Sequence, residues 1–296
     1  NYGCPHGMCE RGMGSAVGQD PKANEVITGW VKEFATRPVL VKLTPSITDI
    51  RDPARAAVRG GADGISLINT VKSIVSVDID RFTPQPTVGG KGTNGGYCGP
   101  AVKPIALFMV GELARDPEVR VPISGIGGVA NWRDAVEFLL MGSTSVQVCT
   151  AVMHHGFRIV EGMIEGLSSY MQDKGFRTVR EMVGKAVPNF VDWGDLDLNY
   201  KTVAKIRDDL CIQCQLCYIA CHDTAYQCIH MPANGSRIPY VDEARCVGCN
   251  LCYHVCPVPG CIEMQERDSG KAPMTWNDYA AAGMKASPPP GSYGKI

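Results

Sequence analysis

Eight of the 14 cysteines in this 296-residue chain lie in two short runs with the same spacing, C-x2-C-x2-C-x3-C. This is the spacing of bacterial ferredoxins with two [4Fe–4S] clusters, in which three cysteines of a run bind one cluster and the fourth binds the other. Zinc modules, the alternative, usually separate two ligand pairs by about 12 to 20 residues. We therefore expect one cluster at Cys211, Cys214, Cys217 and Cys256, and the other at Cys246, Cys249, Cys252 and Cys221.

Two further cysteines, Cys228 and Cys261, follow the runs by seven and five residues. We expect both to be small buried side chains that pack beside the clusters. His222 follows the first run where Pro257 follows the second, which alters the turn after Cys221 but not its role as a ligand. Iron–sulfur clusters carry electrons, so the pattern also predicts a donor on one side and an acceptor on the other.

Cys4 stands before Pro5 in a glycine-rich opening segment, NYGCPHGM. A thiol with an ordinary pKa of about 8.5 is mostly protonated at neutral pH and can donate a proton in catalysis. Cys4 is therefore a candidate general acid, and a packed structural cysteine is the alternative.

Four short apolar runs precede the cysteine runs, and each is followed by a polar or glycine-rich segment and then by a helical pattern. They span residues 38–43, 64–68, 121–124 and 145–149. Strands that alternate with helices predict an α/β fold with a parallel sheet. Between the second run and the next helix we expect a long loop, residues 71–100.

Chemically useful residues come at or just after the ends of these strands. This placement is typical of a (β/α)8 TIM barrel, whose active site is built at the carboxyl ends of its strands. A doubly wound sheet is the alternative, but its G-x-G-x-x-G turn is absent. Four strands cannot close an eight-stranded barrel, so we expect the C-terminal half of one, with about half of the barrel upstream of Asn1. The residues concerned are Lys42, Asn69, Thr70, Gly127, Gly128, Cys149 and Thr150.

Two of these strand ends could hold a phosphate group. GIGG, residues 125–128, opens a helix, and VCT, residues 148–150, follows the next strand. In barrels, the loops after the last two strands form the common phosphate site through their backbone N–H groups. GIGG alone is more often a tight turn, and the second loop favours phosphate binding. Lys42 could lie against an anionic flavin ring, with a solvated lysine as the alternative.

The composition of the chain limits which classes of partner it can be expected to bind. It is 45% hydrophobic and 20% charged with a net charge of −1, which is ordinary for a globular protein and lacks the basic excess of a nucleic-acid binder. No run of 18 apolar residues suggests a membrane span. Oxygen-sensitive clusters and free thiols suggest a reducing cytoplasm.

The composition changes near residue 190 and predicts four segments. We expect a partial barrel over 1–190 and a linker over 191–205. A small α+β ferredoxin-like domain with two [4Fe–4S] clusters should follow over 206–266, and the Pro/Gly/Ser-rich 267–296 should be a flexible tail.

The segments NYGCPHGM, VKLTPSITDI, INT, SGIGG and QVCTAV resemble the dihydropyrimidine dehydrogenase family. The chain is most similar to the iron–sulfur flavoprotein subunit of its bacterial NAD-dependent members, and more widely to barrels of the dihydroorotate dehydrogenase type. The resemblance runs from Asn1 to about Glu266. Two departures are Cys98, where relatives often have serine, and Gly3, where the nearest ones often have serine too.

The resemblance implies a role for each site residue. Lys42 would contact the ring of a bound FMN, Gly99 its rim, and Gly127, Gly128, Cys149 and Thr150 its phosphate. Asn1, Asn69 and Thr70 would hydrogen-bond the pyrimidine base. Reduced FMN would deliver hydride to C6 of uracil or thymine, and Cys4, which matches the family's catalytic cysteine, would protonate C5.

The resemblance also implies partners. NAD(P)H would be oxidised by a reductase subunit or domain that carries FAD, with electrons arriving through the two clusters, and we expect an oligomer. Two alternatives stay open. One is a dihydroorotate dehydrogenase-type oxidoreductase that acts on another cyclic amide, and the other is a ferredoxin-like electron-transfer protein whose barrel remnant is not catalytic.

Overall fold

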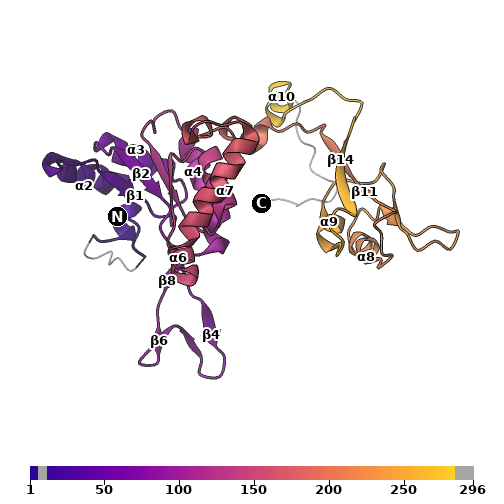
Figure 1. Ribbon diagram of the computed structural model, residues 1–296, viewed down its shortest axis with the longest axis horizontal. Coiled ribbons are helices and arrows are strands. Elements are labelled where there is room, and N and C mark those ends of the chain that lie inside the picture. The colour runs from indigo at the N-terminus through magenta and orange to yellow at the C-terminus, as the bar shows by residue number, and fades with distance from the viewer. Residues whose placement is uncertain (6–11, 284–296) are drawn as a thin grey trace. The chain divides into compact units, whose positions relative to one another are not determined.

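The computed structural model describes residues 1–5 and 12–283, and the chain forms two compact units, Asn1–Phe190 and Val191–Ile296 (Figure 1). Each unit has a hydrophobic core of its own. Residues 284–296 of the expected tail lie outside the described residues.

The first unit is built on a four-stranded parallel sheet with the strand order β1-β2-β9-β10. Its strands are the four expected from the sequence, and the parallel α/β arrangement is therefore confirmed. They span Leu40–Lys42 (β1), Gly64–Leu67 (β2), Ile123–Ile126 (β9) and Ser145–Gln147 (β10).

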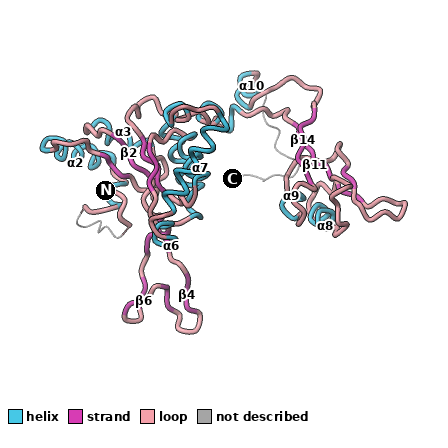
Figure 2. The backbone as a smooth tube through the Cα atoms, in the orientation of Figure 1, coloured by secondary structure: helices cyan, strands magenta, loops and turns pink. Residues whose placement is uncertain are grey.

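Some helices of this unit contact the sheet directly, and others pack on a neighbouring helix (Figure 2). Local sequence sets where some of them start: the Asp20 carboxylate accepts the N–H groups of residues 22 and 23 ahead of α2, and Asn131 with Asp134 forms a capping box on α5. The helices are α1 (Ser15–Gly18), α2 (Pro21–Phe34), α3 (Arg51–Arg59), α4 (Lys103–Ala114), α5 (Trp132–Leu140), α6 (Thr150–His155) and α7 (Ile159–Lys174), with short 3-10 turns η2 (Pro100–Val102), η3 (Val179–Glu181) and η4 (Val187–Asn189).

The two alternating rows of side chains on the sheet differ in chemistry, because successive residues of a strand point to opposite faces. Val41, Ile65 and Ile123 are in register and buried in the core. The neighbouring row holds Lys42, Ser66 and Ser124 in register. This second row is polar.

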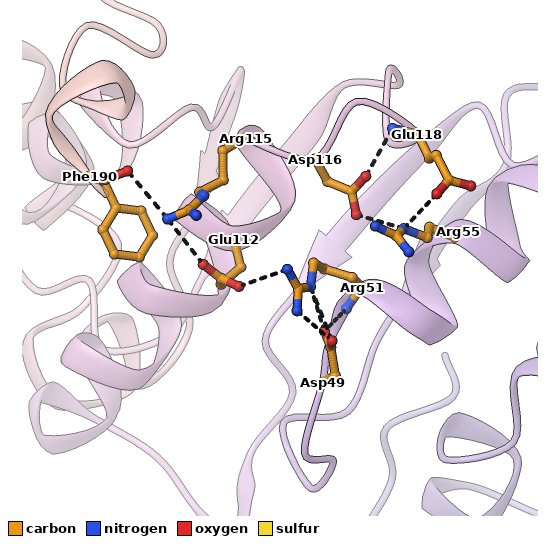
Figure 3. A network of polar contacts seen from close by, with 8 residues as sticks. All are labelled: Asp49, Arg51, Arg55, Glu112, Arg115, Asp116, Glu118 and Phe190. Atoms are coloured by element: carbon orange, nitrogen blue, oxygen red, sulfur yellow. Dashed lines mark hydrogen bonds and ion pairs between the residues drawn. The ribbon is translucent and has the colours of Figure 1, made fainter. Parts of the chain in front are cut away.

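A charged network joins α3 to α4 (Figure 3). Nε of Arg55 lies 2.8 Å from Oδ2 of Asp116, whose side chain is fully buried. Arg51 pairs with Asp49 at 2.7 Å and with Glu112 at 3.7 Å. A buried carboxylate needs such a partner, so the network fixes these helices against each other.

The segment between β2 and α4 differs from the long loop that the sequence predicts. It forms three antiparallel strand pairs that extend away from the sheet (Figure 1). Glycine and proline turns fold the segment back on itself, and short strands between them pair locally. The pairs are β3 (Val71–Ser73) with β8 (Gly95–Tyr97), β4 (Ser76–Asp78) with β5 (Thr83–Gln85), and β6 (Thr87–Val88) with β7 (Lys91–Gly92).

The described part of the second unit contains two antiparallel strand pairs and two short helices, and a 3-10 turn near its start contacts a third helix near its end. β11 (Lys201–Ile206) pairs with β14 (Ile262–Arg267), and β12 (Ile229–His230) pairs with β13 (Tyr240–Val241). The helices are α8 (Leu216–His222), α9 (Leu251–Val255) and α10 (Trp276–Ala281), and the 3-10 turn is η5 (Trp193–Asp195).

Two expected boundaries differ in the structure. The predicted linker, residues 191–205, contains most of β11, whose partner strand lies about 60 residues later along the chain. The predicted tail, 267–296, contains α10, which Thr275 and Asp278 cap reciprocally. Both elements depend on pairing or capping partners that composition does not reveal.

Candidate active site and cluster cavities

A pocket opens where the four parallel strands end, and it collects eight of the predicted site residues. Its empty space is about 830 Å³ including the open mouth. The eight residues are Lys42, Asn69, Thr70, Gly99, Gly127, Gly128, Cys149 and Thr150.

The topology explains why these residues meet. Lys42 is the last residue of β1, Asn69 and Thr70 follow β2, and Gly127 follows β9. Carboxyl ends of parallel strands share one edge of a sheet, so residues far apart in sequence come together there. Thr150 begins α6 just after β10 and completes the row.

Glycines let the backbone line the pocket closely. Gly128 has φ 75°, and a Cβ there would lie 2.8 Å from the carbonyl oxygen of Gly99 and 2.8 Å from the amide nitrogen of Lys103. Gly127 has φ 137°, and a Cβ there would lie 2.8 Å from Cβ of Ala106. Neither a left-handed conformation nor the available space suits another residue. The backbone N–H groups of such a turn are suited to an anionic ligand.

The opening segment reaches the same edge of the sheet. Nδ2 of Asn69 donates to Oδ1 of Asn1 at 2.8 Å, and the amide of Thr70 donates to Oδ1 of Asn69 at 2.7 Å. Tyr2 is fixed by its amide, which donates to the carbonyl of Lys42 at 2.9 Å. Asn1, Asn69 and Thr70 therefore form one hydrogen-bonded group.

Cys4 is exposed and, like Asn1, is not among the described residues that line the pocket. Its carbonyl accepts the amide of Ser15 at 2.9 Å, and the next carbonyl, that of Pro5, accepts Nδ2 of Asn94 at 3.3 Å. The backbone around Cys4 is thus tied to α1 and to the segment before β8.

Sequence reasoning missed several residues that line the pocket, notably Gln147, His154 and His155. Nε2 of Gln147 donates to Oγ of Ser66 at 2.9 Å and to Oγ of Ser124 at 2.8 Å, so its amide is held by the polar row of the sheet. Alternation along β10, which places Gln147 on the same face as Ser145, is the signal that could have found it.

Two smaller cavities in the second unit each contain one set of the predicted cluster cysteines. The first cluster cavity is lined by Cys211, Cys214, Cys217 and Cys256, and the second cluster cavity by Cys221, Cys246, Cys249 and Cys252. Each set includes the crossing cysteine of the other run. Cys261 also lines the first cavity and Cys228 the second.

The loops that present these cysteines repeat the same backbone conformation. Gln213 and Gly248 have φ 62° and 68°, and Gln215 and Asn250 have φ 64° and 66°. Left-handed non-glycine residues cost free energy and persist where a site requires them. Each loop thus turns successive thiols towards one centre.

The chemistry of the thiols fits iron–sulfur binding. Burial raises the pKa of Cys217 and of Cys252 to about 11, because an apolar cavity disfavours a thiolate without a counter-charge. Bound iron would supply that charge and displace the protons. Among the described residues, no three or more His, Cys, Asp or Glu side chains surround a point where one metal ion could bind. The ligands of a [4Fe–4S] cluster need not surround a single point, because each thiolate binds a different iron atom of the cluster.

Comparison with known proteins finds a matching family for each of the two units. Residues 1–171 match the family model of dihydroorotate dehydrogenase. The chain belongs to this family. Residues 204–264 match a 4Fe-4S dicluster domain, so the dihydroorotate dehydrogenase-like unit is followed by an iron–sulfur domain. The two matches support a flavin and iron–sulfur chemistry.

The similar proteins within this family include dihydropyrimidine dehydrogenases and dihydroorotate dehydrogenases. The chain is 48% identical over 267 residues to the NAD-dependent dihydropyrimidine dehydrogenase subunit PreA of Escherichia coli, covering 90% of this chain and 64% of the relative. It is 42% identical over 211 residues to the chloroplastic dihydropyrimidine dehydrogenase (NADP(+)) of Arabidopsis thaliana, covering 70% and 50%. To the catalytic subunit of dihydroorotate dehydrogenase B (NAD(+)) of Pyrococcus horikoshii it is 43% identical over 187 residues, covering 63% and 58%.

The resemblance to dihydropyrimidine dehydrogenases that the motifs suggest is confirmed. The chain spans less than two thirds of the length of each of these relatives. Within residues 1–5 and 12–283, no helix has the length and apolar character to cross a bilayer.

Proposed function

We propose that this chain is the catalytic portion of a dihydropyrimidine dehydrogenase that reduces the C5–C6 bond of uracil and thymine in pyrimidine catabolism. One observation carries the proposal: eight predicted flavin and substrate residues line one pocket, and the same chain provides two four-cysteine cavities. The 48% identity to a dihydropyrimidine dehydrogenase subunit across both units supports it. We further propose that the four-stranded sheet is the later half of a TIM barrel.

The pocket suits FMN, which when bound would supply a hydride for C6 of the base. The glycine turn at Gly127 and Gly128, with Cys149 and Thr150, would hold its phosphate through backbone N–H groups. Lys42 would place a positive charge beside the ring, and Gly99 would lie at the ring's rim. A cation stabilises the negative charge that the ring gains on reduction.

Asn1, Asn69 and Thr70 would orient the pyrimidine base. Uracil and thymine present amide N–H and carbonyl groups, and the carboxamide side chains offer the complementary donors and acceptors. The hydrogen bond between Asn69 and Asn1 holds both amides in place. Cys4 would hold the proton that C5 receives as hydride arrives at C6, a role in which a positioned acid contributes about 10²–10⁴-fold.

Electrons would enter through the second unit. We propose two [4Fe–4S] clusters, at Cys211, Cys214, Cys217 and Cys256 and at Cys246, Cys249, Cys252 and Cys221. The name of the bacterial relative, an NAD-dependent subunit, supports a partner that oxidises NAD(P)H, for which we propose an FAD-carrying subunit or domain. We place this assembly in the cytoplasm and expect it to be an oligomer.

The test is anaerobic turnover of the full-length protein with its reductase partner. NADH or NADPH should be consumed only when uracil or thymine is added, and 5,6-dihydropyrimidine should accumulate in equal amount. Consumption that does not depend on either base, or that depends on another cyclic amide, would contradict the proposed substrate.

The similarity to dihydroorotate dehydrogenase B favours a second candidate, oxidation of dihydroorotate or action on another cyclic amide. The match to that relative is 80 residues shorter than the match to PreA (267 − 187). A screen of uracil, thymine, dihydroorotate and hydantoins separates the two candidates. A protein without flavin absorbance would instead favour an electron-transfer protein with a non-catalytic barrel unit.

A further inference from the structure

Each cluster cavity contains a fifth cysteine beside its four proposed ligands. Cys228 lines the second cluster cavity directly before β12, and Cys261 lines the first directly before β14. Both side chains are buried, with 5% and 3% of their surface exposed. A four-coordinate set leaves these two thiols without a role as ligands.

Cys228 contacts the crossing ligand of its cavity. Sγ of Cys228 lies 3.5 Å from Sγ of Cys221, and the backbone amide of Cys228 donates to Sγ of Cys221 at 3.3 Å. The Cys221 sulfur thus has two potential donors from one residue. Cys261 is placed differently, because its thiol donates to the carbonyl oxygen of Arg207 at 3.8 Å.

Cluster binding decides which of the two sulfurs at 3.5 Å is the donor. Cys221 binds iron as a thiolate, which carries no proton and can only accept a hydrogen bond. The S–H of Cys228 is then the donor. Reduction adds negative charge to a cluster and its sulfurs, so a donated hydrogen bond stabilises the reduced form more than the oxidised form.

We propose that the Cys228 thiol donates a hydrogen bond to the Cys221 sulfur and thereby raises the reduction potential of the cluster in the second cavity. The inference rests on the proposed iron–sulfur function. It assigns Cys228 a tuning role in place of the simple packing role expected from the sequence. Cys261 is the matched cysteine, because it is equally buried, its thiol donates to the carbonyl of Arg207, and it lines the first cavity and not the second.

The experiment compares the full-length holoprotein with Cys228→Ala, Cys228→Ser and Cys261→Ala. Iron and sulfide content are measured first, followed by anaerobic potentiometric titration of the two clusters monitored by electron paramagnetic resonance. Cys228→Ala should keep both clusters and shift one midpoint potential to a more negative value. Cys228→Ser, which retains a donor, should recover part of the shift, and Cys261→Ala should leave that cluster's potential unchanged.

The outcomes separate the tuning role from the cluster assignment. An unchanged potential in Cys228→Ala with both clusters present would overturn the tuning role. Loss of one cluster in Cys228→Ala would also overturn it, because Cys228 would then be a ligand or a structural residue. A parent protein that binds no clusters would overturn the iron–sulfur function itself.

Discussion

Nδ2 of Asn69 donates a 2.8 Å hydrogen bond to Oδ1 of Asn1, although 68 residues separate the two. The same oxygen accepts the amide of Gly3 at 3.1 Å. The two carboxamide side chains that we propose bind the substrate base are therefore oriented by each other and by the backbone before any ligand binds. Such preorganisation lowers the entropic cost of binding and of reaching a reactive geometry.

Gly3 makes this contact possible. A Cβ on residue 3 would lie 2.5 Å from Cβ of Asn69 and 2.6 Å from its Nδ2, closer than non-bonded atoms can approach. We expect Gly3→Ala to displace Asn69 and to lower kcat/KM for uracil by about tenfold, equivalent to about 1.4 kcal/mol. Steady-state kinetics and the thermal midpoint measure the effect.

Gly29→Ala provides the control for Gly3→Ala. Gly29 lies within α2, and apart from its chain neighbours and the nearby backbone of that helix, no described heavy atom lies within 4 Å of the position of its Cβ. Alanine inside a helix is favoured over glycine by about 0.5–1 kcal/mol, so this variant should be as stable as the parent or more stable. Equal kcat/KM for Gly3→Ala and Gly29→Ala would show that the contact with Asn69 is irrelevant.

Cys4 is predicted to supply the proton for C5. Cys4→Ala should lower kcat by about 10²–10⁴-fold, the contribution expected of a positioned general acid. Flavin absorbance and iron content should match those of the parent, because Cys4 lines none of the three cavities in the described part of the chain. Turnover of Cys4→Ala at the rate of the parent protein would show that Cys4 is not the general acid.

The glycine turn is predicted to hold the flavin phosphate. Gly128→Ala should lose bound FMN, since φ is 75° and a Cβ would meet the carbonyl of Gly99 at 2.8 Å. Gly175→Ala is matched for backbone strain, with φ 73° and, apart from its chain neighbours, no described heavy atom within 4 Å of its Cβ position. The left-handed conformation should cost each variant about 1–2 kcal/mol of stability, and Gly128→Ala should lose more because of the backbone contact. Only Gly128→Ala should lose flavin, measured by absorbance after gel filtration. Equal flavin content in the two variants would contradict the phosphate site.

Lys103 links α4 to α5. Its Nζ lies 2.6 Å from Oδ1 of Asp134 and 2.8 Å from Oε2 of Glu137, and hydrogen bonds to these carboxylates raise the pKa of Lys103 above its usual value. A pKa raised on folding stabilises the protein below the unfolded value of about 10.4, and this contribution is lost as the pH rises through the folded pKa.

Lys103→Met should therefore lower the thermal midpoint at pH 8 to 9, and its difference from the parent should shrink above about pH 10.4. Differential scanning fluorimetry from pH 8 to 11.5 measures the trend. A difference that stays constant across this range would mean that the charge of Lys103 does not contribute.

The sequence predicted the parts of the structure that depend on short-range pattern. The four strands were visible as apolar runs before polar ends. Cysteine spacing alone grouped Cys221 with the second run, and in the structure Cys221 lines the same cavity as Cys246, Cys249 and Cys252. What it missed depends on long-range partners. β11 requires β14, and the hydrogen bonds of Gln147 require Ser66, 81 residues earlier.

The segment between β2 and α4 was missed for a different reason. Its strands are two or three residues long, too short for alternation to be read against the glycine and proline turns. Helix α10 within the predicted tail was missed because composition alone does not reveal the capping box of Thr275 and Asp278.

The central claim is that electrons stored in this protein reduce a pyrimidine base. The most direct measurement is a single turnover of the anaerobically reduced full-length holoprotein without its reductase partner. Addition of uracil or thymine should reoxidise the flavin and yield dihydrouracil or dihydrothymine in stoichiometric amount. A reduced flavin that stays reduced with both bases, or that is reoxidised without formation of a dihydropyrimidine, would contradict the account.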